Sequence, residues 1–269
     1  MAAKNRIALA SARNPFLQEL RRALEQGELT ADGCLAVEGP HLVEEAVRSG
    51  LPVTALVAAR GAEALLGRFE AATNGRAQSY LVPERAFRAL TQTETPQGVA
   101  ALVRLAARRL DDCLAQPRAL AAVLVGVQDP GNLGTVMRSL EAFGGAACLL
   151  TPKTVSPFNA KAVRASAGSI FRVPVFTALP AEKILAACRA HKLKTVGLAP
   201  RAGQSLGELD LRGQVAFFIG QEAAGLPRSL LTQLDTTASI PLAAPVESLN
   251  AAMAATLALY EAARQRAFR

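Results

Sequence analysis

Three short polar segments in the second half of the sequence carry residue types that could perform chemistry. Each follows an apolar run: QDPGNLGTVMR comes after VLVGV, GQEAAG after VAFFI, and AAPVESLN after SIPL. Such runs are typical of strands buried in a parallel sheet, and ligands bind beyond the carboxyl ends of these strands. We therefore expect the three segments to meet at one edge of a sheet and to form a single site.

The first segment combines a helix start with an arginine. Pro130 and Gly131 turn the chain, and Asn132 is a candidate cap for the helix that follows. Arg138 comes about a turn and a half later and offers a planar guanidinium group for phosphate or ribose oxygens. Taken alone, this segment is explained more simply as a capped helix with an ordinary surface arginine.

The other two segments place a carboxylate and two polar groups at the same predicted edge. Gly220 permits close backbone approach at a strand end, and Glu222 directly after a buried strand needs a partner or a role in the reaction. Ser248 and Asn250 stand at the start of a long helix, where unpaired backbone N–H groups face any bound ligand. Taken alone, Glu222 is explained equally well by a salt bridge that shapes the loop, and the polar residues at the helix start by a helix cap. Three such segments after strands of one sheet favour a site.

Hydrophobic periodicity predicts the elements that position these segments. Strands are predicted at 34–39, 53–59, 78–82, 99–105, 119–127, 146–151, 172–176, 194–199, 214–220 and 238–242. Helices are predicted at 14–26, 41–50, 83–90, 132–144, 159–169, 181–191 and 248–266. The regular alternation from residue 119 onward indicates an α/β fold with a parallel sheet covered on both faces. We expect an N-terminal α/β domain at 1–107, a connection at 108–118 and a C-terminal domain at 119–269.

One face of the terminal helix is apolar. Leu249, Met253, Leu257 and Tyr260 recur at helical spacing. Such a stripe is typical of a helix that packs on a core. We therefore expect these side chains to be buried.

The charge of the chain favours a polyanionic partner. The formal net charge is +8 and the isoelectric point is about 9.9. Residues 1–107 hold 12 Lys and Arg against 11 Asp and Glu, whereas residues 108–269 hold 18 against 11, so the excess lies in the second part. An Arg-rich proteome is the plainer explanation. Aromatic residues make up only 4% and Trp is absent, which argues against binding by rows of stacked bases.

Other classes of protein are excluded on composition. The four cysteines are widely separated, and with two histidines they form no metal-site spacing. We therefore expect no metal, no disulfide and a reducing cytoplasmic location. The N-terminus lacks the apolar stretch of a signal peptide, and no run approaches the ~20 apolar residues of a membrane span.

Together the three segments resemble the three motifs of the SpoU/TrmH family of RNA ribose 2′-O-methyltransferases. The matching residues are Asn132, Gly134 and Arg138 in the first motif, Gly220, Glu222 and Gly225 in the second, and Ile240, Pro241, Glu247, Ser248, Leu249 and Asn250 in the third. The stretches NPFLQELRRAL, AVEGPHLVEEAVRSG and TETPQGVAALV resemble the family's substrate-binding domain, which is similar to small ribosomal proteins that bind kinked RNA. The resemblance covers nearly the whole chain.

The sequence departs from the family pattern at a few positions. Gln221 and Ala223 stand where the second motif usually has Asn and Gly, and Ala251 and Ala252 replace a frequent Val-Ser after the third motif. Gln keeps the amide group at greater reach, and Ala suits only a negative φ. These changes concern the geometry of the loops.

The resemblance implies a fold, a cofactor and a set of roles. The C-terminal domain would be a Rossmann-like parallel sheet with a deep trefoil knot, and it would form a homodimer. S-adenosylmethionine would be the cofactor. The residues expected to contact it are Thr151, Gly220, Gly225, Ile240 and Leu249. Arg138 would be the main catalytic residue, positioned with the ribose by Asn132, Glu222, Ser248 and Asn250. Basic residues near the site would bind RNA, and those expected to do so are Lys153, Lys161, Arg164 and Arg172.

The expected reaction is methylation of a ribose 2′-hydroxyl in structured RNA, with ribosomal RNA favoured over transfer RNA. Two alternatives remain open: a non-catalytic RNA-binding or ribosome-assembly protein, and a base methyltransferase of the wider knotted superfamily. The presence of Arg138 together with Ser248 and Asn250 argues against both.

Overall fold

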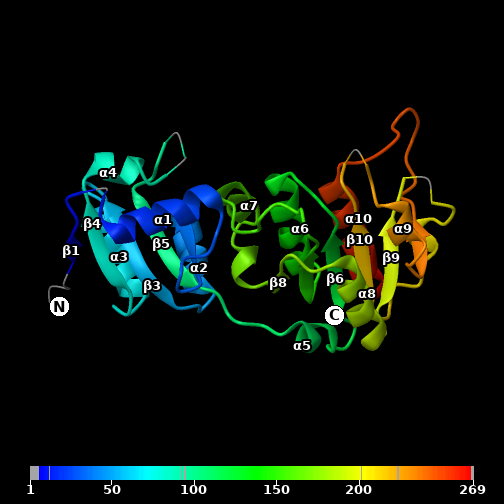
Figure 1. The fold of residues 1–269 in the computed structure, drawn as a ribbon. Coiled ribbons are helices and arrows are strands. Elements are labelled where there is room, and N and C mark those ends of the chain that lie inside the picture. The colour runs from blue at the N-terminus through cyan, green and yellow to red at the C-terminus, as the bar shows by residue number, and fades with distance from the viewer. Residues whose placement is uncertain are drawn as a thin grey trace. The chain divides into compact units, whose positions relative to one another are not determined.

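The computed structural model describes residues 6–267 except Ala12, Gln92, Glu94, Arg201 and Ala223. The chain forms two units, shown in Figure 1. Unit 1 comprises residues 1–107 and 158–171, and unit 2 comprises residues 108–157 and 172–269. Among the described residues, no helix is long and apolar enough to cross a membrane.

Unit 1 is a mixed five-stranded sheet with the order β1-β4-β3-β5-β2. Its strands are β1 (Ile7–Ala8), β2 (Cys34–Glu38), β3 (Val53–Ala59), β4 (Gln78–Val82) and β5 (Val99–Arg104). β5 runs antiparallel to β2 and β3, and the other pairs are parallel. Its helices are α1 (Pro15–Gln26), α2 (Pro40–Arg48), α3 (Glu63–Ala72), α4 (Glu84–Arg88) and α7 (Ala160–Ala165), followed by the 3₁₀ turn Ser169–Phe171. The sequence had not predicted β1 or α3.

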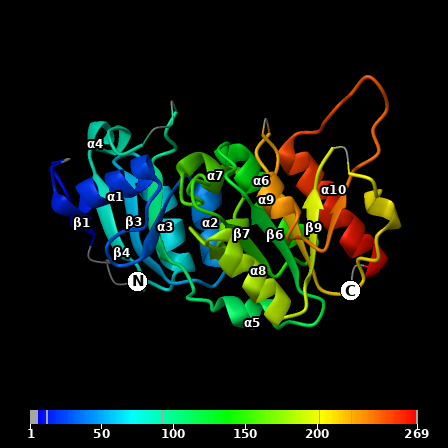
Figure 2. The ribbon, with the colours of Figure 1, turned by 45° about the vertical axis from the view of Figure 1, so that its right-hand side comes forward.

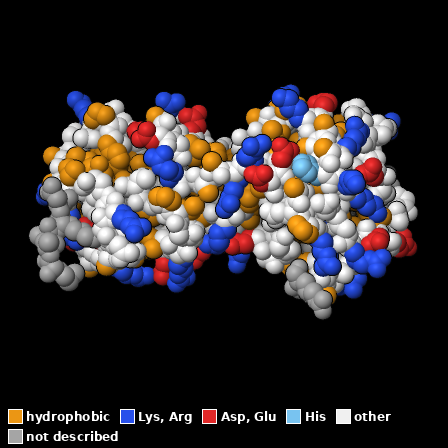
Figure 3. Space-filling view, turned by 90° about the horizontal axis from the view of Figure 1, so that it is seen from below, with side chains coloured by type: hydrophobic (Ala, Val, Ile, Leu, Met, Phe, Trp, Pro, Cys, Tyr) orange, Lys and Arg blue, Asp and Glu red, His pale blue; other side chains and the backbone are white. Residues whose placement is uncertain are grey.

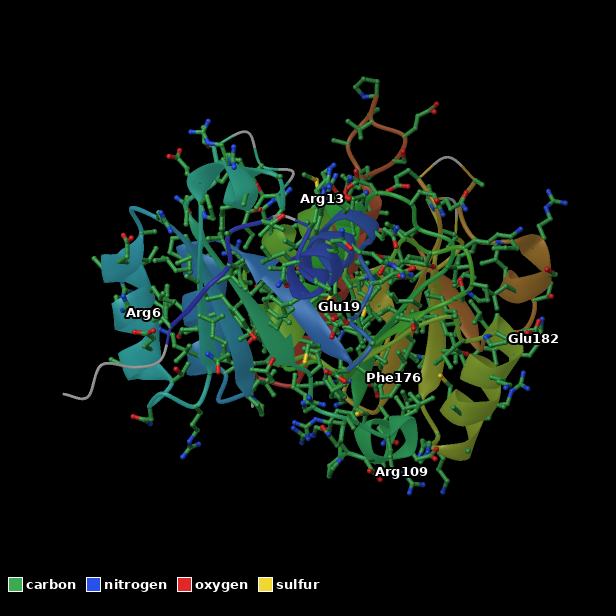
Figure 4. The ribbon with its side chains drawn as sticks, turned by 60° about the vertical axis from the view of Figure 1, so that its left-hand side comes forward. Arg6, Arg13, Glu19, Arg109, Phe176 and Glu182 are labelled. Atoms are coloured by element: carbon green, nitrogen blue, oxygen red, sulfur yellow. The ribbon has the colours of Figure 1, made fainter. Side chains whose placement is uncertain are left out.

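Local chemistry sets these elements as the sequence predicted. Asn14 caps α1 by accepting from the Phe16 backbone N–H at 3.0 Å, Pro15 occupies the first turn, and Gly27 ends the helix in the left-handed conformation. The segment before β1 is tied to α3 by a two-bond ion pair, Arg6 Nε to Glu70 Oε1 at 3.0 Å and Nη2 to Oε2 at 2.8 Å. Figure 4 labels Arg6 beside this helix.

Unit 2 is a six-stranded, entirely parallel sheet with the order β11-β9-β10-β6-β7-β8. Its strands are β6 (Leu120–Leu124), β7 (Ala147–Leu150), β8 (Val175–Phe176), β9 (Lys194–Leu198), β10 (Val215–Ile219) and β11 (Thr236–Ala238). Its helices are α5 (Leu110–Leu114), α6 (Pro130–Ala142), α8 (Ala181–Ala190), α9 (Arg228–Leu231) and α10 (Ala251–Gln265), with a 3₁₀ turn at Leu206–Glu208. The predicted parallel sheet is confirmed.

Helices cover both faces of this sheet (Figure 2). α6 and α10 pack on each other and on β6 and β10, while α5 and α8 belong to the core cluster on the other face. Residues of the central strand β10 alternate between these faces: Ala216 and Phe218 face the α8 side, and Phe217 on the other face is fully buried. Strands buried on both faces explain the unbroken apolar runs in the sequence.

Two expectations about domain organisation were wrong. The predicted connection at 108–118 contains α5, whose Cys113 and Leu114 are buried in the core of unit 2. Residues 158–171, expected in the C-terminal domain, belong to unit 1. There α7 packs on β2, and a Cβ atom at Gly27 would lie 2.7 Å from the Cα atom of Asn159. Order along the chain does not show which core a short helix joins.

The expected burial of the α10 stripe was also wrong. Met253, Leu257 and Tyr260 are 61%, 41% and 42% exposed. The face of α10 that is buried consists almost entirely of alanines, together with Leu259. Small side chains allow close approach to α6, and this leaves the larger apolar side chains on the outside.

Candidate functional site

A cavity lies at the carboxyl edge of the unit 2 sheet, where the site was predicted. Its volume is about 270 Å³. The walls come from four segments: 198–200 after β9, 219–225 after β10, 238–242 within and after β11, and 248–254 at the start of α10. The sequence analysis pointed to the second, third and fourth. It missed the segment after β9, although the apolar run KTVGLA and the strand-end rule would have identified it.

Of the five residues predicted to bind a cofactor, four line this cavity: Gly220, Gly225, Ile240 and Leu249. Gly220 has no room for a side chain, because a Cβ atom there would lie 2.2 Å from the carbonyl carbon of Gly225. Gly225 itself has a φ of +64°, the left-handed region that favours glycine. The chain therefore makes a tight turn at the cavity wall, in which the Gly225 N–H donates to the Gln221 carbonyl at 2.9 Å.

The fifth residue, Thr151, lies elsewhere. It follows β7, two strands away from β10, and it does not line the cavity. Its Oγ1 accepts a hydrogen bond from the Gly126 N–H at 3.1 Å and lies near the Leu124 carbonyl. The structure thus places Thr151 as a brace between the loops after β6 and β7, which corrects the expectation that it faces this cavity.

Asn132, Glu222 and Asn250, one from each motif, form a hydrogen-bonded chain beside the cavity. Asn250 Nδ2 donates to Asn132 Oδ1 at 2.9 Å, and Asn132 Nδ2 donates to Glu222 Oε1. Glu222 also lines the cavity, so the chain reaches its wall. The site predicted from three separated sequence segments is assembled here by direct contacts.

The start of α10 fixes the direction of this chain. Asn250 caps the helix, and its Oδ1 accepts from the backbone N–H groups of Ala252 at 2.9 Å and Met253 at 3.2 Å. Its Nδ2 must then be the donor, Asn132 Oδ1 the acceptor and Asn132 Nδ2 the next donor. The group that meets Asn132 must accept, which an ionised Glu222 does.

Asn132 is free for this role because it does not cap α6. Asp129 is the cap, and its Oδ1 accepts from the Asn132 backbone N–H at 2.9 Å. Pro130 occupies the first helical position, which places the cap at Asp129, three residues upstream of Asn132. The sequence interpretation of Asn132 as a cap was therefore wrong, and its side chain bonds to Glu222 and Asn250 instead.

Arg138 lies on the exposed side of α6, six residues after Asn132. Among the described residues, its side chain has no hydrogen-bond or ion-pair partner. Its guanidinium group is thus not part of the Asn132–Glu222–Asn250 chain. Ser248 is exposed and lines the cavity. An arginine without protein partners retains all its donors for a ligand.

Gln221 reaches from the loop after β10 to the loop after β6. A Cβ atom at Gly126 would lie 2.7 Å from its Nε2 atom, so the glycine provides the space for the longer amide. Gly126 has a φ of +67°. This contact shows where the longer Gln221 side chain, one departure from the family pattern, is accommodated. The second departure in this loop, Ala223, lies outside the described residues.

The cations predicted to bind RNA are divided between the two units. Arg172 pairs with Glu141 in unit 2, and Lys153 stands exposed in the loop after β7. Lys161 and Arg164 belong to α7 in unit 1. Burial raises the pKa of the Glu38 carboxyl above its ordinary value. The hydrogen bond from the Thr93 hydroxyl, at 2.8 Å, and the positive charge of Arg164 each lower this pKa and offset part of the rise.

The remaining titratable groups give no sign of a metal site or a reactive thiol. Among the described ranges there is no group of His, Cys, Asp and Glu that could hold a metal ion. All four cysteines are buried, and burial raises the pKa of Cys148 and that of Cys188 to about 12. These thiols stay protonated at neutral pH and pack as apolar side chains.

A parallel α/β sheet with a cavity beside a polar network at its carboxyl edge defines a ligand-binding enzyme unit. Comparison with known proteins identifies the kind. Residues 119–260 match the SpoU rRNA Methylase family, and residues 14–101 match the MRM3-like substrate binding domain. The chain belongs to the SpoU rRNA methylase family.

Relatives extend over nearly the whole chain. The chain is 34% identical over 254 residues to the 23S rRNA (guanosine(2553)-2′-O)-methyltransferase RlmP of Bacillus subtilis, covering 94% of this chain and 97% of the relative. The AdoMet-bound rRNA methyltransferase from Sinorhizobium meliloti superposes with a TM-score of 0.83 at 28% identity, covering 96% and 97%. The SpoU methyltransferase AviRb from Streptomyces viridochromogenes in complex with AdoMet gives 0.83 at 28%, covering 95% and 99%.

Proposed function

We propose that this protein transfers a methyl group from S-adenosylmethionine to a ribose 2′-hydroxyl of ribosomal RNA. The observation that carries the proposal is the hydrogen-bonded chain of Asn132, Glu222 and Asn250 beside the cavity. It joins residues of all three family motifs, and RlmP is named as a ribose 2′-O-methyltransferase of 23S rRNA. The alternatives of a binding protein and a base methyltransferase are less well supported.

The cavity residues fit S-adenosylmethionine. Apolar side chains such as Ile240 and Leu249 suit the adenine ring, and the glycines at 220 and 225 let backbone groups approach the ligand. Glu222 and Ser248 add polar groups at the same wall. When bound, the cofactor supplies an electrophilic methyl group on a sulfonium. Thr151 would act through the loop that it braces.

The protein's own residues would bind and orient the ribose. A ribose hydroxyl is a poor nucleophile near neutral pH, and it must lie in line with the methyl group. Arg138 stays protonated, so it cannot act as the base. It would anchor the neighbouring phosphate and stabilise the negative charge that develops on the oxygen. The Asn132–Glu222–Asn250 chain, with Ser248, would hold the ribose against the cavity.

Unit 1 would bind the RNA and select the site, as its match to a substrate-binding domain supports. Arg164, Lys161 and Lys153 would contribute contacts to phosphate groups, whereas Arg172 would act mainly through its pair with Glu141. A ribosomal RNA substrate would be met in the cytoplasm. A homodimer would form through the exposed apolar face of α10, made of Met253, Leu257 and Tyr260.

We also propose that unit 2 contains the deep trefoil knot that the family resemblance implies. The loops after β9, β10 and β11 all line one cavity, so segments distant in sequence meet there. Close contact of these loops is what threading of the chain at this point would require.

Transfer of labelled methyl groups tests the reaction. The enzyme is incubated with labelled S-adenosylmethionine and ribosomal or transfer RNA, and the RNA is then hydrolysed with alkali. Label in alkali-resistant dinucleotides shows 2′-O-methylation, and we expect it with ribosomal RNA. Because Arg138 stabilises developing charge, Arg138→Ala should lower turnover by roughly 100-fold or more and leave cofactor affinity unchanged. Label released in mononucleotides would move the reaction to a base. Absence of label on either RNA would favour a binding protein.

A further inference from the structure

The amino edge of the unit 2 sheet, opposite the cavity, is a continuous surface formed by loops that bind one another. Gln214 Nε2 donates to the carbonyl oxygens of Leu114 at 3.2 Å and Gln116 at 3.0 Å. His191 Nε2 lies 3.1 Å from Asp111 Oδ1, which joins the end of α8 to α5. These contacts hold the segments 108–119, 189–194 and 210–214 side by side.

Cations without partners gather on this edge. Within the described residues of these segments, the exposed cationic side chains that make no ion pair or hydrogen bond are those of Arg108, Arg109, Arg118, Arg189 and Lys192. We call these five residues the basic edge. Figure 3 views the molecule from this side and shows Lys and Arg side chains over unit 2, with acidic side chains among them. Figure 4 labels Arg109 at α5.

Other exposed arginines of unit 2 show what a paired side chain looks like. Arg212 pairs with Asp210 at 2.9 Å, and Arg264 pairs with Glu261 at 2.8 Å, both as exposed local ion pairs. Arg118 and Lys192, by contrast, stand in turns with φ values of +60° and +59°. Glycine or asparagine suits this left-handed region better. Within the described residues neither Arg118 nor Lys192 has an ion-pair partner, and Lys153 in the loop after β7 shares their left-handed backbone with a φ of +67°.

We propose that the basic edge is a second RNA-binding surface, which binds the phosphate backbone of the substrate at a distance from the methylated nucleotide. This rests on the proposed function. The five residues of β6 separate the two edges, and at about 3.3 Å per residue they span roughly 16 Å. An RNA that reaches both edges must therefore be folded or several nucleotides longer than the site itself. With no aromatic side chain among the five residues, the contacts would be to phosphate groups and independent of sequence.

The test neutralises four of the five cations in the full-length protein: Arg108→Gln, Arg109→Gln, Arg189→Gln and Lys192→Gln together. The matched control is Lys183→Gln with Arg228→Gln, two exposed cations without described partners that lie outside the basic edge. Affinity for a 23S rRNA transcript is measured by filter binding across a salt series, and methyl transfer is measured at saturating RNA. Circular dichroism and cofactor affinity confirm that each variant is folded.

We expect the fourfold variant to bind the transcript about 10- to 100-fold more weakly at 0.15 M salt. Its plot of log affinity against log salt should lose a slope of about 3, because each lost phosphate contact removes roughly 0.7 to 0.9. Its rate at saturating RNA should match wild type. Unchanged affinity and slope, or an equal loss in the control variant, would overturn the inference. If the wild-type protein methylates no RNA, the proposed function fails instead.

Discussion

The two edges of the unit 2 sheet handle polar groups in opposite ways. At the carboxyl edge, Asn132, Glu222 and Asn250 satisfy one another in a chain of fixed direction beside a cavity. At the amino edge, exposed cations stand without partners around one buried arginine, Arg266. The first arrangement orders a few atoms for a ligand of defined shape. The second presents charge to a large polyanion and needs no exact geometry.

Helix α10 connects the two edges. Asn250 caps its start and belongs to the site, while Arg266 follows its last turn and lies at the amino edge. Arg266 is 9% exposed and donates from Nε to the Leu211 carbonyl at 3.0 Å, from Nη1 to that of Arg118 at 2.8 Å, and from Nη2 to that of Gly213. The same helix thus orients the hydrogen-bonded chain at one end and is anchored by a buried cation at the other.

The largest effect is expected from reversing a donor in the site. Asn132→Asp replaces the amide that donates to Glu222 with a second carboxylate, so the chain loses its direction and two like charges meet. Turnover in the methyl-transfer assay should fall by roughly 100- to 1,000-fold, with cofactor affinity nearly unchanged. Because a shared proton raises the pKa of one carboxyl, part of the activity should return as the pH is lowered.

The control for this change is Thr135→Ala, an exposed position on the same helix whose hydroxyl donates to the Gly131 carbonyl at 2.8 Å. It should leave turnover close to that of wild type. Wild-type turnover in Asn132→Asp would show that the direction of the chain has no role in the reaction.

A smaller effect, on stability, is expected at the other end of α10. Arg266→Ala removes three hydrogen bonds from a largely buried guanidinium and leaves the carbonyl groups at the amino edge without their donor. The free energy of unfolding in urea should fall by about 3 kcal/mol. Arg264→Ala, in an exposed ion pair two residues away, should change it little. Equal effects would show that the anchor contributes no more than a surface pair.

The sequence predicted the carboxyl edge better than the amino edge, for a physical reason. A carboxylate directly after a buried strand stands out against an apolar background, which identified Glu222, and a polar residue at the start of a long helix identified Asn250. Arg266 and Arg118 lie in charged stretches where nothing in the local pattern separates a buried anchor from a solvent-exposed side chain. Their roles depend on which carbonyl groups and loops the fold brings beside them.

Periodicity failed in a similar way on α10. It identified an apolar stripe at Met253, Leu257 and Tyr260, but it could not show what covers that stripe. The alanine face, which the sequence made less conspicuous, packs inside the unit. The sequence pattern also could not predict that residues 158–171 belong to unit 1, because this depends on contacts between residues distant in sequence.

The smallest effect on methyl transfer by a single subunit is expected from a substitution in the exposed apolar stripe of α10. Tyr260 packs edge-on against Phe143 with ring centroids 5.8 Å apart, so the end of α6 extends the apolar surface. If this surface binds a second copy, Leu257→Glu places a charge in a desolvated interface and should convert the dimer to a monomer in light scattering. Ala190→Glu, at an exposed position of α8, should leave the mass unchanged.

A dimer that persists in Leu257→Glu would mean that another face joins the subunits, and a wild-type monomer would leave the stripe without this partner. Because Asn250 lies less than two turns before Leu257 on the same helix, cofactor affinity of the monomeric variant then shows whether the interface supports the site.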